Sequence, residues 1–123
     1  MGKIDASNHG EILTLRASGP LTADEVVGAI NERYPGMAGS RVLWDLSAAD
    51  MSGQTQADFA RIASAARNAR SPGKHFKTAF VVADAQNFAK QWRYINQAFT
   101  ARVPVEYAAF RDRGSAERWL LER

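Results

Sequence analysis

The chain has 123 residues, of which 46% are hydrophobic, with no cysteine and a formal net charge of +3. This length suits one domain with a real core, and the absence of cysteine excludes disulfides, zinc–thiolate sites and thiol nucleophiles. The opening segment MGKIDASNHG has no apolar stretch of the signal-peptide kind, and no run approaches the ~18 apolar residues of a membrane span. We therefore expect a single soluble, cytoplasmic domain over residues 1–123, with no membrane span.

A β-hairpin is expected at the start of the chain. The segments KIDAS (3–7) and EILTLRA (11–17) alternate polar and apolar side chains, as half-buried strands do. Between them, Asn8-His9-Gly10 contains residues that adopt the positive φ of a tight turn. We expect Gly19-Pro20 to break the second strand.

A helix is expected after the hairpin. Thr22 and Glu25 have the spacing of a capping box, in which the hydroxyl accepts from a free helical N–H and the carboxylate reaches back to the cap. Pro35-Gly36 is expected to end the helix. Apolar side chains recur between these signals and predict a buried stripe at Val26, Val27, Ile30 and Tyr34.

The rest of the chain alternates between strand and helix patterns. Residues 41–46 and 78–83 are nearly continuously apolar, which is typical of strands covered on both faces. Residues 55–70 between them repeat apolar side chains at helical spacing, and Ser71-Pro72-Gly73 is expected to stop that helix. The remaining expected elements are a third helix with Phe88, Trp92, Ile95 and Phe99 on one face, a strand at 103–110, and a last helix that is capped by Asp112 or Ser115 and bears Ala116, Trp119 and Leu120.

The expected order of elements is β-β-α-β-α-β-α-β-α. Strands that alternate with helices after an opening hairpin predict an α/β fold with a mostly parallel sheet, about four helices and crossover connections. No internal repeat or long linker divides the chain, so one domain is expected over its whole length.

The ending VEYAAFRDRGSAERWLLER resembles the bacterial SpoIIAA-like family, which is distantly related to STAS domains. That family typically closes with a strand, an F-R-D turn and a helix that ends in A-x-x-W-L. The matching residues are Phe110, Arg111, Asp112, Ala116, Trp119 and Leu120. RVLWDLS (41–47) is similar to the family's strand ending in Asp-Leu, and GPLTADEV (19–26) to its first-helix entry. The resemblance spans nearly the whole chain and implies a SpoIIAA/STAS-like, five-stranded mixed sheet with helices packed on it.

The resemblance also draws attention to the loop after residue 46. Relatives of the anti-sigma-factor antagonist type carry a phosphorylatable serine in a D-S-x-G-like loop after this strand. Here Asp50-Met51-Ser52-Gly53 keeps the three residue types, but a methionine separates the acid from the serine. Ser52 is therefore a candidate phosphorylation site, with Thr55 as a competitor. Either hydroxyl can instead be a plain helix cap, which contributes about 1 kcal/mol.

Asp45 and Asp84 are expected to end two successive parallel strands. Ligands of open α/β sheets bind outside the carboxyl ends of the strands, and a few carboxylates with water suit Mg²⁺. With Asp50 nearby, these two residues are candidates for a shared ligand site. The alternative is that they cap loops and following helices. We expect no cofactor and no metal, because no glycine-rich phosphate loop or positioned lysine accompanies them.

Phe88, Trp92 and Ile95 share the apolar face of the expected third helix. Amphipathic helices of soluble domains usually bury such a face, at about 25 cal/mol per Å² of apolar surface. The alternative is that the helix covers an apolar pocket with a basic rim. Such a pocket would suit a small apolar or anionic ligand, for example a fatty acid.

Basic charge is concentrated in the second half of the chain. Residues 1–61 carry five basic and eight acidic side chains, whereas residues 62–123 carry eleven basic and five acidic ones. Such a stretch is a solvated face or contacts an anion or an acidic partner. Nucleic acid is not expected, because no recognition motif is present. The candidate contact residues are Arg67, Arg70, Lys74, Lys77, Lys90 and Arg93.

We prefer a non-catalytic regulatory or protein-interaction module of the STAS type, acting through the loop at 47–55 and neighbouring helices. A binding module needs only a surface, whereas an enzyme needs a constellation of groups that this sequence does not display. The second hypothesis is a lipid or small-molecule binding module with an apolar pocket near the third helix. The third is a metal-dependent enzyme that uses Asp45 and Asp84. The expected partner is an unknown protein or a small ligand, and the exposed edge of the opening hairpin also allows a homodimer.

Overall fold

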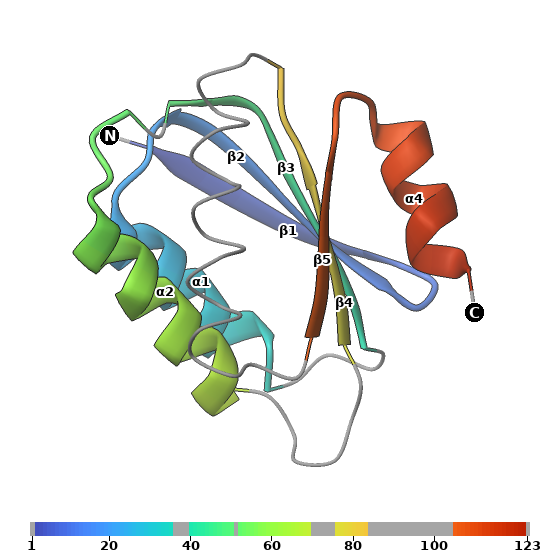
Figure 1. The fold of residues 1–123 in the computed structure, drawn as a ribbon, viewed down its shortest axis with the longest axis horizontal. Coiled ribbons are helices and arrows are strands. Elements are labelled where there is room, and N and C mark those ends of the chain that lie inside the picture. The colour runs from blue at the N-terminus through green and yellow to red at the C-terminus, as the bar shows by residue number, and fades with distance from the viewer. Residues whose placement is uncertain (1, 36–39, 51, 70–75, 84–104, 123) are drawn as a thin grey trace.

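The computed structural model describes residues 2–35, 40–50, 52–69, 76–83 and 105–122, which form one five-stranded sheet and three helices (Figure 1). The strands are β1 Lys3–His9, β2 Ile12–Pro20, β3 Arg41–Asp50, β4 Phe76–Val81 and β5 Val105–Phe110. The helices are α1 Ala23–Arg33, α2 Gln56–Ala69 and α4 Arg113–Leu121. The expected helix with Phe88, Trp92, Ile95 and Phe99 falls within 84–104, outside the described residues.

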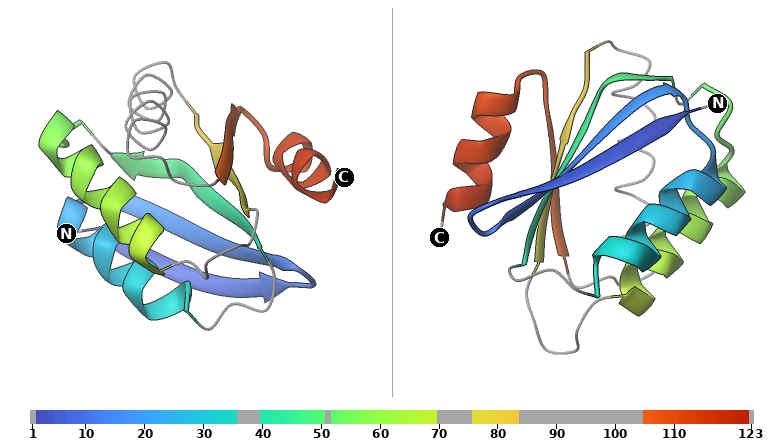
Figure 2. Two further views of the ribbon diagram at one scale, coloured as in Figure 1. Left: turned by 60° about the horizontal axis from the view of Figure 1, so that its bottom comes forward. Right: turned by 180° about the vertical axis from the view of Figure 1, so that it is seen from behind.

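The strands lie in the sheet in the order of the sequence, β1-β2-β3-β4-β5. β1 is antiparallel to β2, and each later strand is parallel to the one before it. The sheet separates the helices into two layers, with α1 and α2 on one face and α4 on the other (Figures 1 and 2). The predicted α/β class and the mostly parallel, five-stranded sheet are therefore confirmed.

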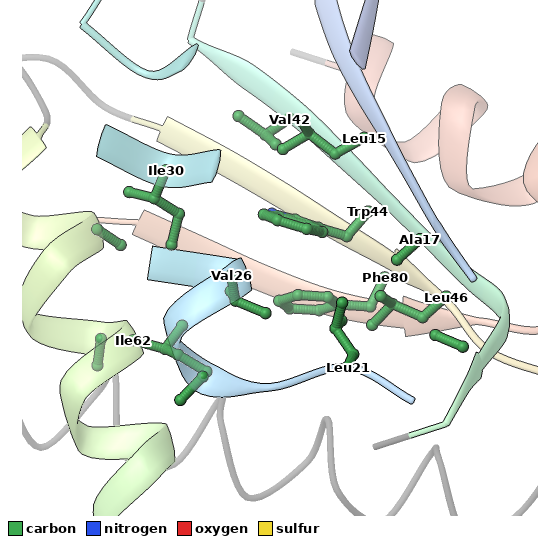
Figure 3. Close-up of a cluster of buried hydrophobic side chains, with 14 of the residues drawn as sticks. Leu15, Ala17, Leu21, Val26, Ile30, Val42, Trp44, Leu46, Ile62 and Phe80 are labelled. Atoms are coloured by element: carbon green, nitrogen blue, oxygen red, sulfur yellow. The ribbon is translucent and has the colours of Figure 1, made fainter. Parts of the chain in front are cut away.

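The larger part of the core lies between the sheet and helices α1 and α2 (Figure 3). Alternate residues of the central strands point into it, because successive side chains of a strand face opposite sides of a sheet. The Nε1 of Trp44 donates a hydrogen bond of 3.0 Å to the hydroxyl of Tyr34, and both side chains are buried. The apolar groups shown together in Figure 3 include Leu15, Val26, Ile30, Val42, Trp44, Leu46, Ile62 and Phe80.

A smaller cluster lies on the opposite face, beneath α4. It consists of Ile12, Leu43, Ala79, Val81, Ala116 and Leu120. Cations from two strands hold the carboxyl-terminal end of α4 above this cluster. Lys77 donates from Nζ to the carbonyls of Trp119 at 3.2 Å and Glu122 at 3.0 Å, and Arg41 donates from Nε to the carbonyl of Leu120. The last carbonyls of a helix lack intrahelical partners and carry partial negative charge, so both cations stabilise the helix end.

The hairpin is confirmed, but several strand boundaries differ from the sequence pattern. Its turn is at residues 10–11, where Gly10 has a φ of 63°. The expected break at Gly19-Pro20 was wrong, because β2 stays paired with β3 up to Pro20 and the N–H of Leu21 then donates to the Asp50 carbonyl at 2.9 Å. Likewise, β3 runs four residues beyond the predicted 41–46, and β4 lies two residues earlier than 78–83.

β3 contains a bulge just before its end. Arg16 of β2 lies opposite Asp45, whereas Ser18 lies opposite Ala48, so β3 has one residue more than β2 over this stretch. The Asp45 carboxylate supports the bulge, since its Oδ1 accepts from the N–H of Ser47 at 3.1 Å and from the Ser47 hydroxyl at 2.7 Å.

Candidate functional site

A recess of about 420 Å³ lies where β2 and β3 end. It is bounded by residues 20–24, which join β2 to α1, and by residues 50 and 52–54 of the connection from β3 to α2. Asp58 and Arg61 from the first turns of α2 complete its wall. The recess therefore lies beside the amino-terminal ends of α1 and α2, at the carboxyl edge of the sheet.

The connection after β3 is held by Asp50. Its Oδ1 accepts from the backbone N–H of Ser52 at 2.9 Å. The hydrogen bond from the Ser52 hydroxyl, and then the one from its N–H, lower the pKa of Asp50, so this carboxylate is charged at neutral pH. Ser52 itself is exposed at the mouth of the recess.

Thr55 caps α2. Its Oγ1 accepts from the N–H of Asp58 at 3.1 Å, and the Asp58 carboxylate accepts in return from the N–H of Thr55 at 2.9 Å. The hydrogen bond that the Asp58 carboxylate accepts from the backbone N–H of Thr55, and then the one from the Thr55 side chain, lower the pKa of Asp58. Of the two candidate caps, Ser52 and Thr55, it is therefore Thr55 that caps the helix, and the Ser52 hydroxyl is turned to Asp50.

The start of α1 is built in the same way and is tied to the start of α2. The predicted capping box is confirmed: the Thr22 Oγ1 accepts from the N–H of Glu25 at 3.2 Å, and the Glu25 carboxylate accepts from the N–H of Thr22 at 3.0 Å. Buried Gln54 donates to the carbonyl of Leu21 at 2.9 Å. Arg61 of α2 pairs with Asp24 of α1 at 2.6 Å.

The charge around the recess is mainly negative, although the whole chain is basic. Asp24, Asp50 and Asp58 contribute three carboxylates to its lining. Arg61 is the basic side chain among the lining residues, and its hydrogen bond with Asp24 raises its pKa. Because helix amino-termini carry partial positive charge, the two capped ends attract these carboxylates.

Asp45 does not belong to this site. It was expected at a strand end, but it lies within β3, because pairing with β2 extends β3 to Asp50. It alternates with buried Trp44, so its side chain is on the α4 face of the sheet, where the Nε of Arg16 lies 4.0 Å away. Among the described residues, no group of three or more His, Asp and Glu side chains could hold a metal ion. Asp84 lies outside those residues, so its pairing with Asp45 stays a prediction.

The remaining predicted residues are mostly beyond the described part of the chain. Lys77 is engaged with the end of α4, and Arg67 is exposed on α2. The ligand pocket near the third helix accordingly stays a prediction. Besides Asp84, the predicted site residues for which no position is described are Arg70, Lys74, Phe88, Lys90, Trp92, Arg93 and Ile95.

Three lining residues, Asp24, Gln54 and Arg61, were not predicted from the sequence. Asp24 and Arg61 are 37 positions apart, and no local pattern connects them. Asp58 had a usable signal, because it follows Thr55 by three residues, as Glu25 follows Thr22.

Comparison with solved structures identifies the class of fold. An uncharacterized protein of the DUF3478 family with a SpoIIAA-like fold, from Shewanella loihica, matches with a TM-score of 0.57 and 18% identity, over 97% of this chain and 93% of that one. An anti-sigma factor antagonist from Mycobacterium paratuberculosis matches with a TM-score of 0.59 and 12% identity, over 99% of this chain and 96% of that one. No family model and no curated protein sequence matches the chain.

The chain therefore has the SpoIIAA-like fold, which confirms what its carboxyl-terminal motif implied. The anti-sigma factor antagonist shares this fold. None of the helices in the described ranges is long and apolar enough to cross a membrane.

Proposed function

We propose that the chain is a non-catalytic, cytoplasmic regulatory module that binds a partner protein through the recess and the start of α2. The observation that carries the proposal is the convergence of two capped helix starts and an exposed serine on one recess. The similarity of fold to an antagonist of an anti-sigma factor, a protein that by its name acts on another protein, supports the same role. A binding module needs such a surface and no catalytic groups.

The charge of the recess favours a partner with a basic side chain at the contact. Asp50 and Asp58 are held ionised by their hydrogen bonds with Ser52 and Thr55. Charges that complement each other across an interface guide the encounter and suppress wrong partners. An arginine or lysine of the partner would enter between these two carboxylates.

Ser52 is the proposed point of control. It is exposed, and the α2 cap does not depend on it, because Thr55 makes that cap. A phosphoryl group on Ser52 would add about −1.5 to −2 charge units at neutral pH. It would replace the hydroxyl that now donates to Asp50 and bring like charges together, so the contact between Asp50 and Ser52 would break and partner binding would weaken.

A photo-crosslinking residue at position 52 tests the proposal, with the same residue at position 7 as the matched control. Both serines are exposed, but Ser7 lies on β1 near the hairpin turn, away from the recess. In cells of the native host, we expect one protein adduct at position 52 that is absent at position 7. The adduct should survive Thr55→Ser and disappear with Asp50→Lys. The same adducts at both positions, or none at 52, would contradict the proposal.

A further inference from the structure

β1 forms one edge of the sheet, and part of its backbone faces away from β2. The two-residue turn makes His9 and Ile12 a hydrogen-bonded pair. Every second residue of β1 back toward Lys3 then exchanges hydrogen bonds with its partner in β2. This alternation directs the N–H and C=O groups of Ile4 and Ala6 outward. Within the described ranges, neither residue has a backbone hydrogen bond beyond the β1–β2 ladder. The edge can therefore accept a further strand.

The side chains along this edge are complementary to a second copy of themselves. Lys3 and Asp5 lie on the same face of β1, with the Lys3 Nζ 3.9 Å from the Asp5 Oδ2, and their side chains are 74% and 67% exposed. If a second β1 is antiparallel to the first and centred on Ile4, each Lys3 lies opposite the Asp5 of the other copy. Opposite charges directly across an antiparallel pair stabilise it.

We propose that a second copy of this chain pairs with β1 through its own β1, antiparallel and centred on Ile4. The outward groups of Ile4 then bond to those of the other Ile4, and Gly2 lies opposite the Ala6 of the second copy. Residues 2–6 of both copies form the contact, and the five strands of each copy join in one continuous sheet. Two reciprocal Lys3–Asp5 pairs fix the register.

The other face of β1 has room for this contact. A hollow of about 330 Å³ lies between β1 and α1, and its lining includes the apolar side chains of Ile4, Ala6 and Ala29. A side chain added at Gly28, above the hollow, would meet no atom within 4 Å. The two-fold axis of an antiparallel strand pair is normal to the sheet, so both α1 helices lie on this face and the two Ile4 side chains meet between them.

Analytical ultracentrifugation of the full chain over a range of concentrations tests the proposal. We expect a monomer–dimer equilibrium for the wild type. Lys3→Glu and Asp5→Lys should each raise the dissociation constant about tenfold, because each replaces two attractive cross-strand pairs by two repulsive ones. The double variant with both changes should restore the wild-type constant. Glu122→Lys, which changes the charge by the same amount as Asp5→Lys but lies at the end of α4, should leave the equilibrium unchanged.

Two further measurements distinguish a contact through β1 from a loss of folding and from a dimer formed through another surface. Melting temperature, recorded for each variant, shows whether the fold is kept. Hydrogen exchange of the wild type, measured above and below the dissociation constant, should show slower exchange of the Ile4 and Ala6 amides in the dimer. A monomer at every concentration overturns the proposal. A dimer that neither reversal weakens, or whose Ile4 and Ala6 amides exchange at the monomer rate, also overturns it and places the contact elsewhere.

Discussion

The Lys77→Met substitution is expected to loosen α4 from the sheet. The Nζ of Lys77 donates to the carbonyls of Trp119 and Glu122 and lies 4.8 Å from the centroid of a Trp119 ring. Methionine has an apolar stem that packs along the same path, but it has neither the charge nor the donors. The substitution therefore removes what the ammonium group contributes and leaves most of the packing in place.

The expected loss is about 2 kcal/mol in the free energy of unfolding. A hydrogen bond from a charged donor contributes about 1.5–3 kcal/mol, a cation at a helix carboxyl end about 0.3–1, and a partly exposed cation–π contact about 0.5–1. The total is smaller than the sum of these values, because one half-buried ammonium makes all three contacts and is fully hydrated in the unfolded chain.

Urea unfolding followed by circular dichroism measures this loss. Arg16→Met is the matched control, because Arg16 is a cation on the same face of the sheet whose Nε is 4.0 Å from Asp45 and whose side chain is 67% exposed. Such exposed pairs contribute little, so the control should cost less than about 0.5 kcal/mol. If Lys77→Met costs no more than Arg16→Met, the role assigned to Lys77 at the end of α4 is refuted.

Three other predictions concern the buried core and the start of α2. Tyr34→Phe should cost about 1–3 kcal/mol in urea unfolding, because the buried N–H of Trp44 loses its acceptor; a cost near zero would contradict this account. Thr55→Ala should cost about 1 kcal/mol through loss of the cap, and Ser52→Ala less than half as much; the opposite order would identify Ser52 as the cap. The lowered pKa of Asp58 means that its charged form adds stability above the ordinary value of 3.8, and that this stability is lost as the pH falls through the folded-state pKa. The free energy of unfolding of Asp58→Asn, measured by urea unfolding, should therefore fall less in acid than that of the wild type. Equal losses would show that ionisation of Asp58 does not contribute to stability.

The starts of the helices could be predicted because a cap is a local structure. Thr22 and Glu25 are three residues apart, and the whole capping box forms within that interval. Asp112 likewise caps α4 by accepting from the N–H of Ser115 at 2.8 Å, as one of the two expected alternatives. The alternation of strand and helix patterns was sufficient to predict a parallel sheet, because parallel strands are joined by long crossover connections that usually contain a helix.

The end of β3 could not be predicted in this way, and neither could the recess. The apolar run stops at Leu46, but the length of a strand is set by its neighbour, and β2 offers partners as far as Pro20. The sequence pattern therefore predicts that Asp45 lies at the carboxyl end of the strand, whereas in the structure the strand continues to Asp50 and Asp45 lies within it. Long-range contacts have no local signal either: the basic pattern predicts Lys77 as a surface contact residue, yet its acceptors are more than 40 residues further along the chain.

The bulge in β3 has a consequence for how the length of this chain can vary. Leu46 and Ala49 both face the core, while Ser47 and Ala48 between them are exposed. Loss of Ser47 would restore strict alternation, with Leu46 and Ala49 still inside and Asp50 still outside. The register with β2 would then be continuous from Arg16 to Ser18. A one-residue deletion is thus tolerable at this point. A deletion elsewhere in β3 would instead move every following side chain of the strand to the opposite face of the sheet, so the bulge is the place where this strand can change in length.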